Sequence, residues 1–321
     1  MSNKWDPTGI SLNPEGFKDG LEKLYKRERF YKKHFYKILI GTLILSVVIS
    51  VLLALGEGYS GVFEMVFIAL IAPIIAFIFF IGSLRSLKKG VMKAKLAAEN
   101  GWVFEPNKNF EIYSVYLEKF PKLFNLGNCY KSLKNVIWGE TKQGVPFVVG
   151  DFKYSVRRRT NKGSNTTNYT DHFFAIKLNA PLKTNFFLGP KNALSKLTNL
   201  FSKKDIQTES IDFNERFYFC YENNGSETQV DIMSVLSPSI LEELAKFGGK
   251  KKRRFKSLSG GVKVYFQGQS IVFLAPGAFF EKTGVSLSPK SLDITQEDRD
   301  ELDRQVSYYF DLGNSIYKNI N

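Results

Sequence analysis

Two clusters of basic side chains are the residues most able to bind a charged partner. The first holds six charges within seven residues: Lys250, Lys251, Lys252, Arg253, Arg254 and Lys256. The second is the run Arg157, Arg158 and Arg159. Such clusters bind anionic lipid headgroups, acidic protein surfaces or nucleic acid phosphates. We predict a lipid or protein partner, because no recognition helix or aromatic RNA-binding strand accompanies the clusters. The plain alternative is a solvated loop in a chain with 45 Lys+Arg, 31 Asp+Glu and a net charge of +14.

Few residues could support catalysis. Cys129, beside Tyr130 and Lys131, is a candidate reactive thiol, and Asp171 next to His172 could orient a base. Cys220 lies in an alternating aromatic run and is predicted to be a core residue. The chain has no GxxxxGK[ST] or GxSxG motif. We therefore predict no enzymatic activity; the alternative is a membrane-bound hydrolase or transferase that uses Cys129 or Asp171/His172.

Cysteine and histidine counts exclude several classes of protein. Two Cys and two His in 321 residues rule out a disulfide scaffold and a multi-histidine metal site. No CxxC or CxxH pair suggests a structural zinc ion. We predict no cofactor and no metal.

Two long uncharged runs lie near the N-terminus. Residues Ile38–Gly56 and Met65–Leu84 carry no charged side chain over nineteen and twenty residues. As helices they would span roughly 28–30 Å, the thickness of the hydrocarbon core of a bilayer. We predict a transmembrane helical hairpin, because two adjacent runs of this length are rare as buried core helices. Neither run holds an ionisable residue, so a transporter or channel made by this chain alone is disfavoured.

Charges beside the two runs predict their orientation. Residues 18–37 carry eight basic and three acidic side chains, and residues 85–95 carry five basic and no acidic ones. The connecting segment Glu57–Glu64 has two acids and no base. By the positive-inside rule both termini are cytoplasmic and the short connection lies outside. Both cysteines should then be free thiols. The glycosylation sequons at Asn165, Asn168 and Asn224 are interpreted as chance occurrences, because a cytoplasmic domain is not glycosylated at them.

Both helices are expected to continue beyond the bilayer. Asn13-Pro14 is a helix start, Leu21 and Leu24 follow at helical spacing, and Arg85–Glu99 reads as a helix ended by Asn100-Gly101. We favour paired extensions that form a cytoplasmic stalk over a basic segment 17–37 lying flat on the inner leaflet. Small residues at every fourth position from Ser46 favour packing within the hairpin, with a homodimer seam as the alternative.

The rest of the chain predicts an α+β domain with a mainly antiparallel sheet and flanking helices. We expect hairpins at 135–156 and 262–275, strands at 169–178 and 211–222, and helices after Pro190, from Pro238 and from Thr295. The predicted division is a helical hairpin over 1–100, with spans at about 38–56 and 65–84, and a cytoplasmic domain over 101–321.

Several segments are similar to those of a known family. They are FNLGNCYKSLKNVIWGE at 124–140, GVPFVVGDFKY at 144–154, FNERFYFCYEN at 213–223, LSPSILEEL at 236–244 and VKVYFQGQSIVFLAPG at 262–277. Together with the basic hairpin, this order resembles a domain-of-unknown-function family of bacterial two-pass membrane proteins. The resemblance implies the same topology and the bacterial inner (cytoplasmic) membrane. Its motifs are packing and turn signatures and supply no catalytic residue.

These observations favour a membrane-anchored cytoplasmic binding or adaptor module of unknown partner. Its basic loops would face anionic lipid or an acidic protein. Formation of a homo-oligomer is an alternative that the sequence leaves undecided. The alternatives are the membrane-bound enzyme and an accessory subunit of a membrane transport or secretion complex.

Overall fold

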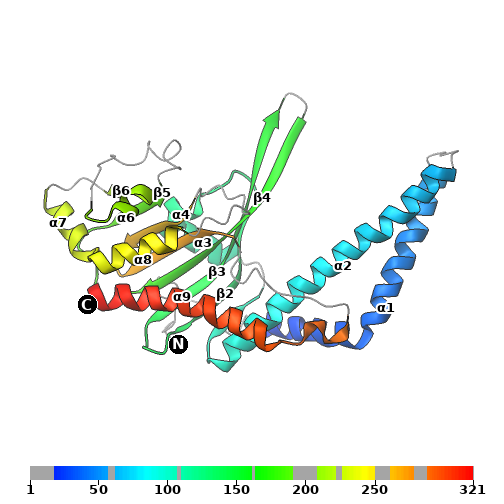
Figure 1. The fold of residues 1–321 in the computed structure, drawn as a ribbon, viewed down its shortest axis with the longest axis horizontal. Helices are drawn as coiled ribbons and strands as arrows, with labels where there is room; N and C mark the ends of the chain where they lie inside the picture. Colours follow the sequence, from blue (N-terminus) through cyan, green and yellow to red (C-terminus); the bar gives the residue numbers. More distant parts are fainter. Residues whose placement is uncertain are drawn as a thin grey trace. The chain divides into compact units, whose positions relative to one another are not determined.

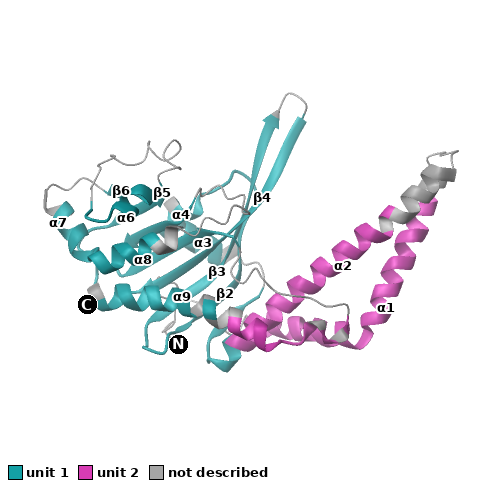
Figure 2. Cartoon of the chain, viewed as in Figure 1, with its two compact units in different colours: residues 1–17, 97–281, 303–321 teal, residues 18–96, 282–302 magenta. Residues whose placement is uncertain are grey.

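A computed structural model describes residues 18–56, 62–106, 110–160, 163–190, 208–221, 226–249, 261–277 and 288–320. The chain divides into two compact units, which are coloured separately in Figure 2. Unit 1 comprises Met1–Phe17, Ala97–Glu281 and Asp303–Asn321, and unit 2 comprises Lys18–Leu96 and Lys282–Leu302. The helices therefore group with a C-terminal segment, 282–302, for which the sequence pattern gave no indication.

Unit 1 is built on one antiparallel sheet of eight strands in the order β1-β2-β3-β4-β8-β7-β5-β6 (Figure 1). Its strands are β1 Val103–Glu105, β2 Lys131–Glu140, β3 Pro146–Thr160, β4 Gly163–Lys177, β5 Phe186–Pro190, β6 Phe217–Tyr221, β7 Lys263–Gln267 and β8 Ser270–Pro276. The predicted α+β class with a mainly antiparallel sheet is confirmed.

Helices pack on both faces of this sheet because successive strand residues point to opposite sides. Phe173 lies in a buried cluster with α3 (Phe110–Lys119) and α4 (Pro121–Phe124). Its neighbour Phe174 instead contacts Tyr309 and Phe310 of α9 (Gln296–Ile320). Gly313 lets α9 approach closely, since a Cβ there would lie 3.1 Å from Ile176.

The remaining described helices of unit 1 are α6 (Ile211–Arg216), α7 (Ser226–Val235) and α8 (Pro238–Gly249). The prediction of a strand from Ile211 was wrong for its first half. Ser210 caps a short helix by accepting a hydrogen bond from the amide of Phe213, and β6 begins only at Phe217. Local capping outweighed the alternating pattern here.

Strands β3 and β4 extend well beyond the rest of the sheet as a two-stranded ribbon (Figure 1). Strand β2 pairs with β3 only as far as Tyr154, and β8 pairs with β4 only from Asp171 onward. The part that follows, Ser155–Thr160 paired with Gly163–Asn168, is called the arm below.

Unit 2 consists of α1 (Lys18–Gly56), α2 (Val62–Glu99) and the short 3-10 helix η3 (Pro289–Leu292). α1 bends at His34, which has non-helical backbone angles of φ −114° and ψ 17°. The two helices run antiparallel: Leu24 lies against Gly90, the Tyr31 and Ser83 hydroxyls are 3.4 Å apart, and Phe35 contacts Phe80. The predicted pairing of the two polar extensions is confirmed.

Other predicted elements compare as follows. The hairpins at β2–β3 and β7–β8, the helix from Pro238 and the helix from Thr295 are confirmed. Gly101 has a φ of +68°, as expected for the residue that ends α2. The helix predicted after Pro190 and the start at Asn13-Pro14 lie outside the described residues.

Candidate functional site

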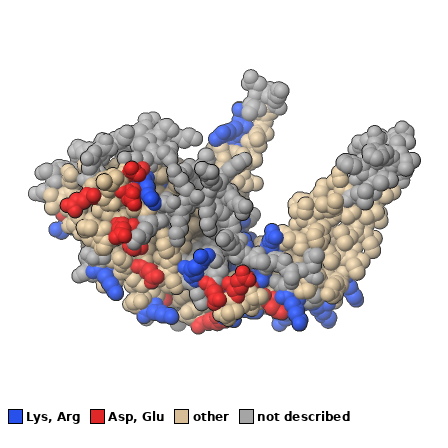
Figure 3. Space-filling model, viewed as in Figure 1, with Lys and Arg blue, Asp and Glu red and all other residues tan. Residues whose placement is uncertain are grey.

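Arg157, Arg158 and Arg159 lie on the arm, and all three side chains are exposed. Because β-strand side chains alternate, Arg157 and Arg159 share one face of the ribbon and Arg158 lies on the other. The face seen in Figure 3 shows basic and no acidic side chains on the described part of the arm. From Ser155 to Thr170 the sequence holds no Asp or Glu.

The base of the arm is held by a loop that precedes β2. The Asn128 side chain accepts a hydrogen bond from the Arg157 amide at 2.8 Å and donates one to the Arg157 carbonyl at 3.0 Å. The amides of Asn128 and Cys129 both donate to the Ser155 carbonyl at 3.2 Å. Across the ribbon, Ser155 donates to Asn168 and Arg157 donates to Ser164. The arginine run is therefore fixed to a braced ribbon.

The larger predicted cluster, Lys250–Lys256, lies outside the described residues. The structure neither joins it to Arg157–Arg159 nor separates it from them, so its role stays a prediction.

The two candidate acid–base residues point to opposite faces of the sheet. Asp171 is fully buried and accepts a hydrogen bond from the Tyr154 hydroxyl at 3.0 Å. On the other face, His172 Nδ1 lies 2.8 Å from the Gly277 carbonyl, and Nε2 is hydrogen-bonded to the Tyr309 hydroxyl. Asp171 therefore cannot orient His172, and the histidine instead ties β4 and α9 together.

The two cysteines are free thiols, as expected. Cys220 is buried in the cluster that also holds Phe187 and Tyr218, so its predicted core role is confirmed. Cys129 is exposed in the loop that braces the arm. Its backbone amide is one of the groups that hold the base of the arm.

A buried amine that the sequence did not indicate lies on the same sheet face as Asp171. Lys263 is only 2% exposed and pairs with Leu274, the strand neighbour of Phe173. Burial lowers the pKa of Lys263 to about 8, and the Asp171 carboxylate offsets part of this effect. Lys263 opens the run KVYFQ, and a basic residue at a strand end usually reads as a solvated one, so no pattern would have identified it.

Unit 2 exposes a large apolar surface on both long helices. Ile40, Ile44, Leu45 and Leu52 of α1 and Ile74, Ile78 and Phe79 of α2 are each more than half exposed. The part of α1 from Lys18 to Leu52 is long and apolar enough to cross a membrane. Only 11% of its most apolar 18-residue stretch is buried. The side chains of 53–70 and of Ala72 are not described, so the second predicted span stays a prediction.

Aromatic and basic side chains border this apolar surface at its polar end. Phe30 and Tyr36 are 55% and 57% exposed, and Lys33, Lys37 and Arg85 are exposed beside them. Aromatic rings and long basic side chains are favoured at the boundary between hydrocarbon and water.

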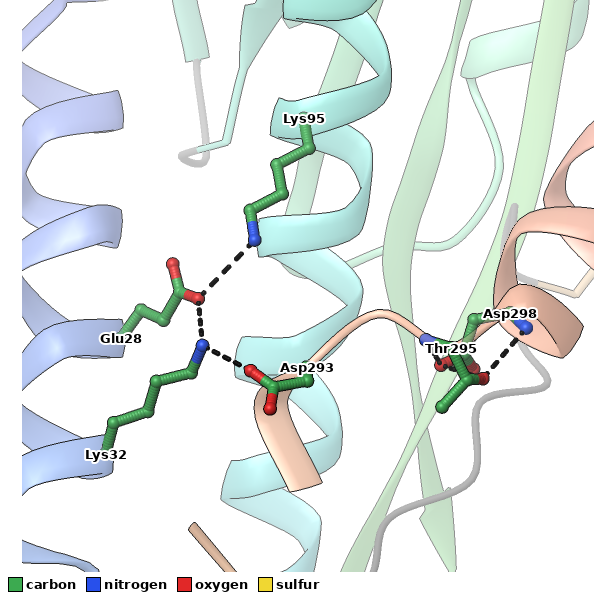
Figure 4. Close-up of polar contacts among 6 residues, drawn as sticks. All are labelled: Glu28, Lys32, Lys95, Asp293, Thr295 and Asp298. Atoms are coloured by element: carbon green, nitrogen blue, oxygen red, sulfur yellow. Dashed lines mark hydrogen bonds and ion pairs between the residues drawn. The ribbon is translucent and has the colours of Figure 1, made fainter. Parts of the chain in front are cut away.

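Unit 2 also contains a network of ion pairs at the same end (Figure 4). The Lys32 ammonium lies 3.0 Å from Glu28 and 2.6 Å from Asp293, while Lys95 lies 3.7 Å from Glu28. Partial burial would lower the pKa of Lys32, but its hydrogen bonds to Asp293 and Glu28 raise it overall. Leu292, fully buried against Phe35, Leu84 and their neighbours, completes the contact. The segment after η3 is thus fastened to both helices.

Asp298 makes a buried ion pair in this region. Its carboxylate lies 2.5 Å from the ammonium of Lys88, and both side chains are less than 10% exposed. The carboxylate also accepts hydrogen bonds from the amide and hydroxyl of Thr295. The Thr295 hydroxyl in turn accepts one from the Asp298 amide, so the two residues cap α9 reciprocally. Burial would raise the pKa of Asp298, but the hydrogen bonds from Lys88 and Thr295 outweigh it and lower the pKa.

The described residues offer no cluster of metal-binding side chains. Within them, no three His, Cys, Asp or Glu side chains are placed to hold a metal ion. What the geometry offers is a braced basic ribbon in unit 1 and an apolar helix pair with a charged end in unit 2.

Comparisons with known proteins add little to this geometry. No protein-family model matches the chain, and no curated protein matches it. Among solved structures, the mycobacterial trehalose monomycolate transport factor A is similar at 10% identity and a TM-score of 0.34. The similarity covers 70% of this chain and 93% of that one. A similarity of this size transfers neither a fold nor a function.

Proposed function

We propose that the protein is a membrane-anchored cytoplasmic binding module. The observation that carries this proposal is the exposed apolar surface of unit 2. Water-exposed apolar patches of this extent are costly, and a lipid bilayer removes the cost. A core helix of a soluble protein would be mostly buried, in contrast to the 11% buried in α1.

The anchor is a hairpin of two spans, 38–56 and 65–84, with both termini in the cytoplasm. The antiparallel contacts between α1 and α2 support a hairpin, since they return the chain to the side from which it came. The exposed basic residues Lys33, Lys37 and Arg85 beside the apolar surface support a cytoplasmic position for the polar end. The location is the bacterial inner membrane.

The module acts by binding and has no catalytic role. The separation of Asp171 from His172 removes one of the two enzyme candidates suggested by the sequence, and Cys129 is the other. The basic run Arg157–Arg159 is exposed and braced, which suits a contact surface. Its partner is anionic lipid or an acidic protein.

Alkaline carbonate extraction tests the anchor. Wild-type protein should stay with the membrane pellet after extraction, and Ile44→Arg combined with Ile78→Arg should shift it to the supernatant. Lys142→Glu, an exposed change in unit 1, is the matched control and should behave as wild type. Release of the wild-type protein by carbonate would overturn the proposal.

Purification from native membranes tests the binding role. A stoichiometric protein that co-purifies in mild detergent would identify the module as an adaptor or as an accessory subunit of a membrane complex. Turnover of a hydrolase or transferase substrate, abolished by Cys129→Ser, would instead favour the enzyme alternative.

A further inference from the structure

We propose that the arm of β3 and β4 binds the headgroup layer of an anionic phospholipid membrane end-on, with Arg157, Arg158 and Arg159 as the phosphate-binding residues. This inference rests on the proposed membrane anchoring, because the anchor supplies the lipid surface. It deepens that proposal by assigning one ligand chemistry to one element.

The positive charges of the arm are placed to contact phosphate groups on both faces of the ribbon. The arginines occupy both faces of the ribbon, and no acidic residue occurs from Ser155 to Thr170. Guanidinium groups bind phosphate oxygens in a bidentate way and keep their charge at any physiological pH. A layer of headgroups surrounds an inserted ribbon and can engage Arg158 as well as Arg157 and Arg159.

The dimensions of the arm also suit this layer. Six residue pairs, from Ser155–Asn168 to Thr160–Gly163, extend it by roughly 20 Å. From Arg157 to Arg159 the ribbon advances by about 7 Å, which is close to the depth of one headgroup layer, about 5–8 Å. The arginine run therefore matches the layer that carries the phosphates.

The β4 residues that pair with the arginines are also polar, which suits the headgroup layer. Ser164, Asn165 and Thr166 are exposed and polar, and Val156 is half-buried near the base of the arm. A hydrogen bond from Arg157 Nη2 to the Ser164 hydroxyl, at 3.0 Å, directs that guanidinium along the ribbon. Bracing by Asn128 lowers the entropy lost when the arm binds.

Duplex nucleic acid fits the arm less well. A ribbon that enters the major groove turns one face toward the bases and the other toward solvent. Either Arg158 or the pair Arg157 and Arg159 would then lose contact with the phosphates. The arm also lacks exposed aromatic rings on which single-stranded bases could stack.

Vesicle binding by the full-length protein tests the inference. The protein is incorporated into nanodiscs of phosphatidylcholine and mixed with acceptor vesicles of phosphatidylcholine with or without phosphatidylglycerol. Near an anionic surface each basic residue contributes about fivefold to binding. Replacing all three arginines by glutamine should therefore weaken partition onto the phosphatidylglycerol vesicles on the order of a hundredfold.

Two further variants separate the arm from overall charge. Lys142→Gln, Lys177→Gln and Lys183→Gln together remove the same charge from exposed sites on unit 1 outside the arm and should weaken partition far less. Replacing the three arginines by lysine keeps the charge but loses the bidentate contacts, so it should weaken partition, though less than the glutamine replacement does. Unchanged thermal melting of the glutamine variant would show that unit 1 still folds.

Distinct outcomes contradict the inference and the proposed function. The inference would be overturned if the three Arg→Gln changes on the arm and the three Lys→Gln changes outside it weakened vesicle binding equally. Tighter retention of the protein by duplex DNA than by vesicles, at matched phosphate concentration, would also overturn it. Incorporation into nanodiscs without binding to phosphatidylglycerol vesicles overturns the inference alone. Failure to incorporate overturns the membrane anchoring and, with it, the inference.

Discussion

Lys263 shows how one buried charge can make stability depend on pH. Its pKa of about 8 in the folded protein lies below the ordinary value of 10.5 because burial disfavours the ammonium. Between these two values the unfolded chain binds more protons than the folded one, so stability rises with pH. Asp171, which faces Lys263 and accepts from Tyr154, limits the size of this effect.

We predict that the full-length protein in detergent is more stable at pH 9 than at pH 8 by about 1 kcal/mol, which a higher melting temperature would show. Lys263→Met should abolish this increase, because the titrating group is gone. Lys142→Met, at an exposed site, is the control and should leave it unchanged. A wild-type melting temperature that falls over this range would contradict the assignment.

Gly127 is a second residue whose identity is set by its surroundings. It has a φ of +74°, and a Cβ there would lie 2.6 Å from the Ser155 carbonyl at the base of the arm. Gly127→Ala should destabilise unit 1 by about 1–3 kcal/mol through backbone strain and this clash. Gly144→Ala also has a positive φ but meets no atom within 4 Å, so it should cost less. Equal losses of thermal stability in the two variants would show that the close approach to Ser155 is unimportant.

At the scale of elements, the segment from η3 to the first turn of α9 is fastened by contacts of unequal strength. Lys88 and Asp298 are both buried, whereas Asp293 is about half exposed. An exposed ion pair contributes about 0.5 kcal/mol, but removing one partner of a buried pair costs about 3–5 kcal/mol. The Asp298 carboxylate also caps α9, so its loss affects two interactions.

We therefore predict that Asp298→Asn strongly speeds amide hydrogen exchange over residues 288–300, while Asp293→Asn changes it little. Hydrogen–deuterium exchange with mass spectrometry measures both variants in the same detergent. The opposite order of effects would mean that the exposed network around Lys32 holds the segment.

Acid should release the same segment. The pKa of Asp298 and that of Asp293 both lie below the usual carboxyl range, so their stabilisation is complete above about pH 4 and is lost as the pH falls through the lower folded values. Exchange over residues 288–300 should accelerate below about pH 4, after correction for the intrinsic rate. Asp298→Asn should show a weaker dependence on pH.

Local sequence signals predicted elements well where the interaction was local. Thr295-x-x-Asp298 predicted the start of α9, and Gly144 marked the turn of the β2–β3 hairpin. The same approach missed α6, because the Ser210 cap competes with an alternating pattern. It could not predict Asp293 beside Lys32, since 261 residues separate them and only the folded chain brings them together.

The candidate site was predicted in part for the same reason. Arg157–Arg159 were recognised as a basic run, but their bracing by Asn128 depends on a loop 29 residues away. Burial of Lys263 follows from strand register, which hydrophobic alternation alone does not determine. Residues 250–260 lie outside the described residues, so the larger basic cluster stays a prediction.

For the whole molecule, the central claim is that unit 2 anchors the chain in a membrane with the sheet-bearing unit 1 in the cytoplasm. Cys129 is an exposed native thiol in unit 1 and Cys220 is buried, so the chain carries a natural probe of its own location. Ser60, in the short segment between the two apolar runs, offers a position on the opposite side of the predicted bilayer.

Thiol labelling in bacterial spheroplasts with a membrane-impermeant maleimide tests this claim most directly. One protein retains only Cys129, and the other carries Ser60→Cys after both native cysteines are replaced by alanine. We predict that Ser60→Cys is labelled in intact spheroplasts and that Cys129 is labelled only after the membrane is opened. Labelling of Cys129 in intact spheroplasts, or of Ser60→Cys only after lysis, would contradict the two-span anchor and its orientation.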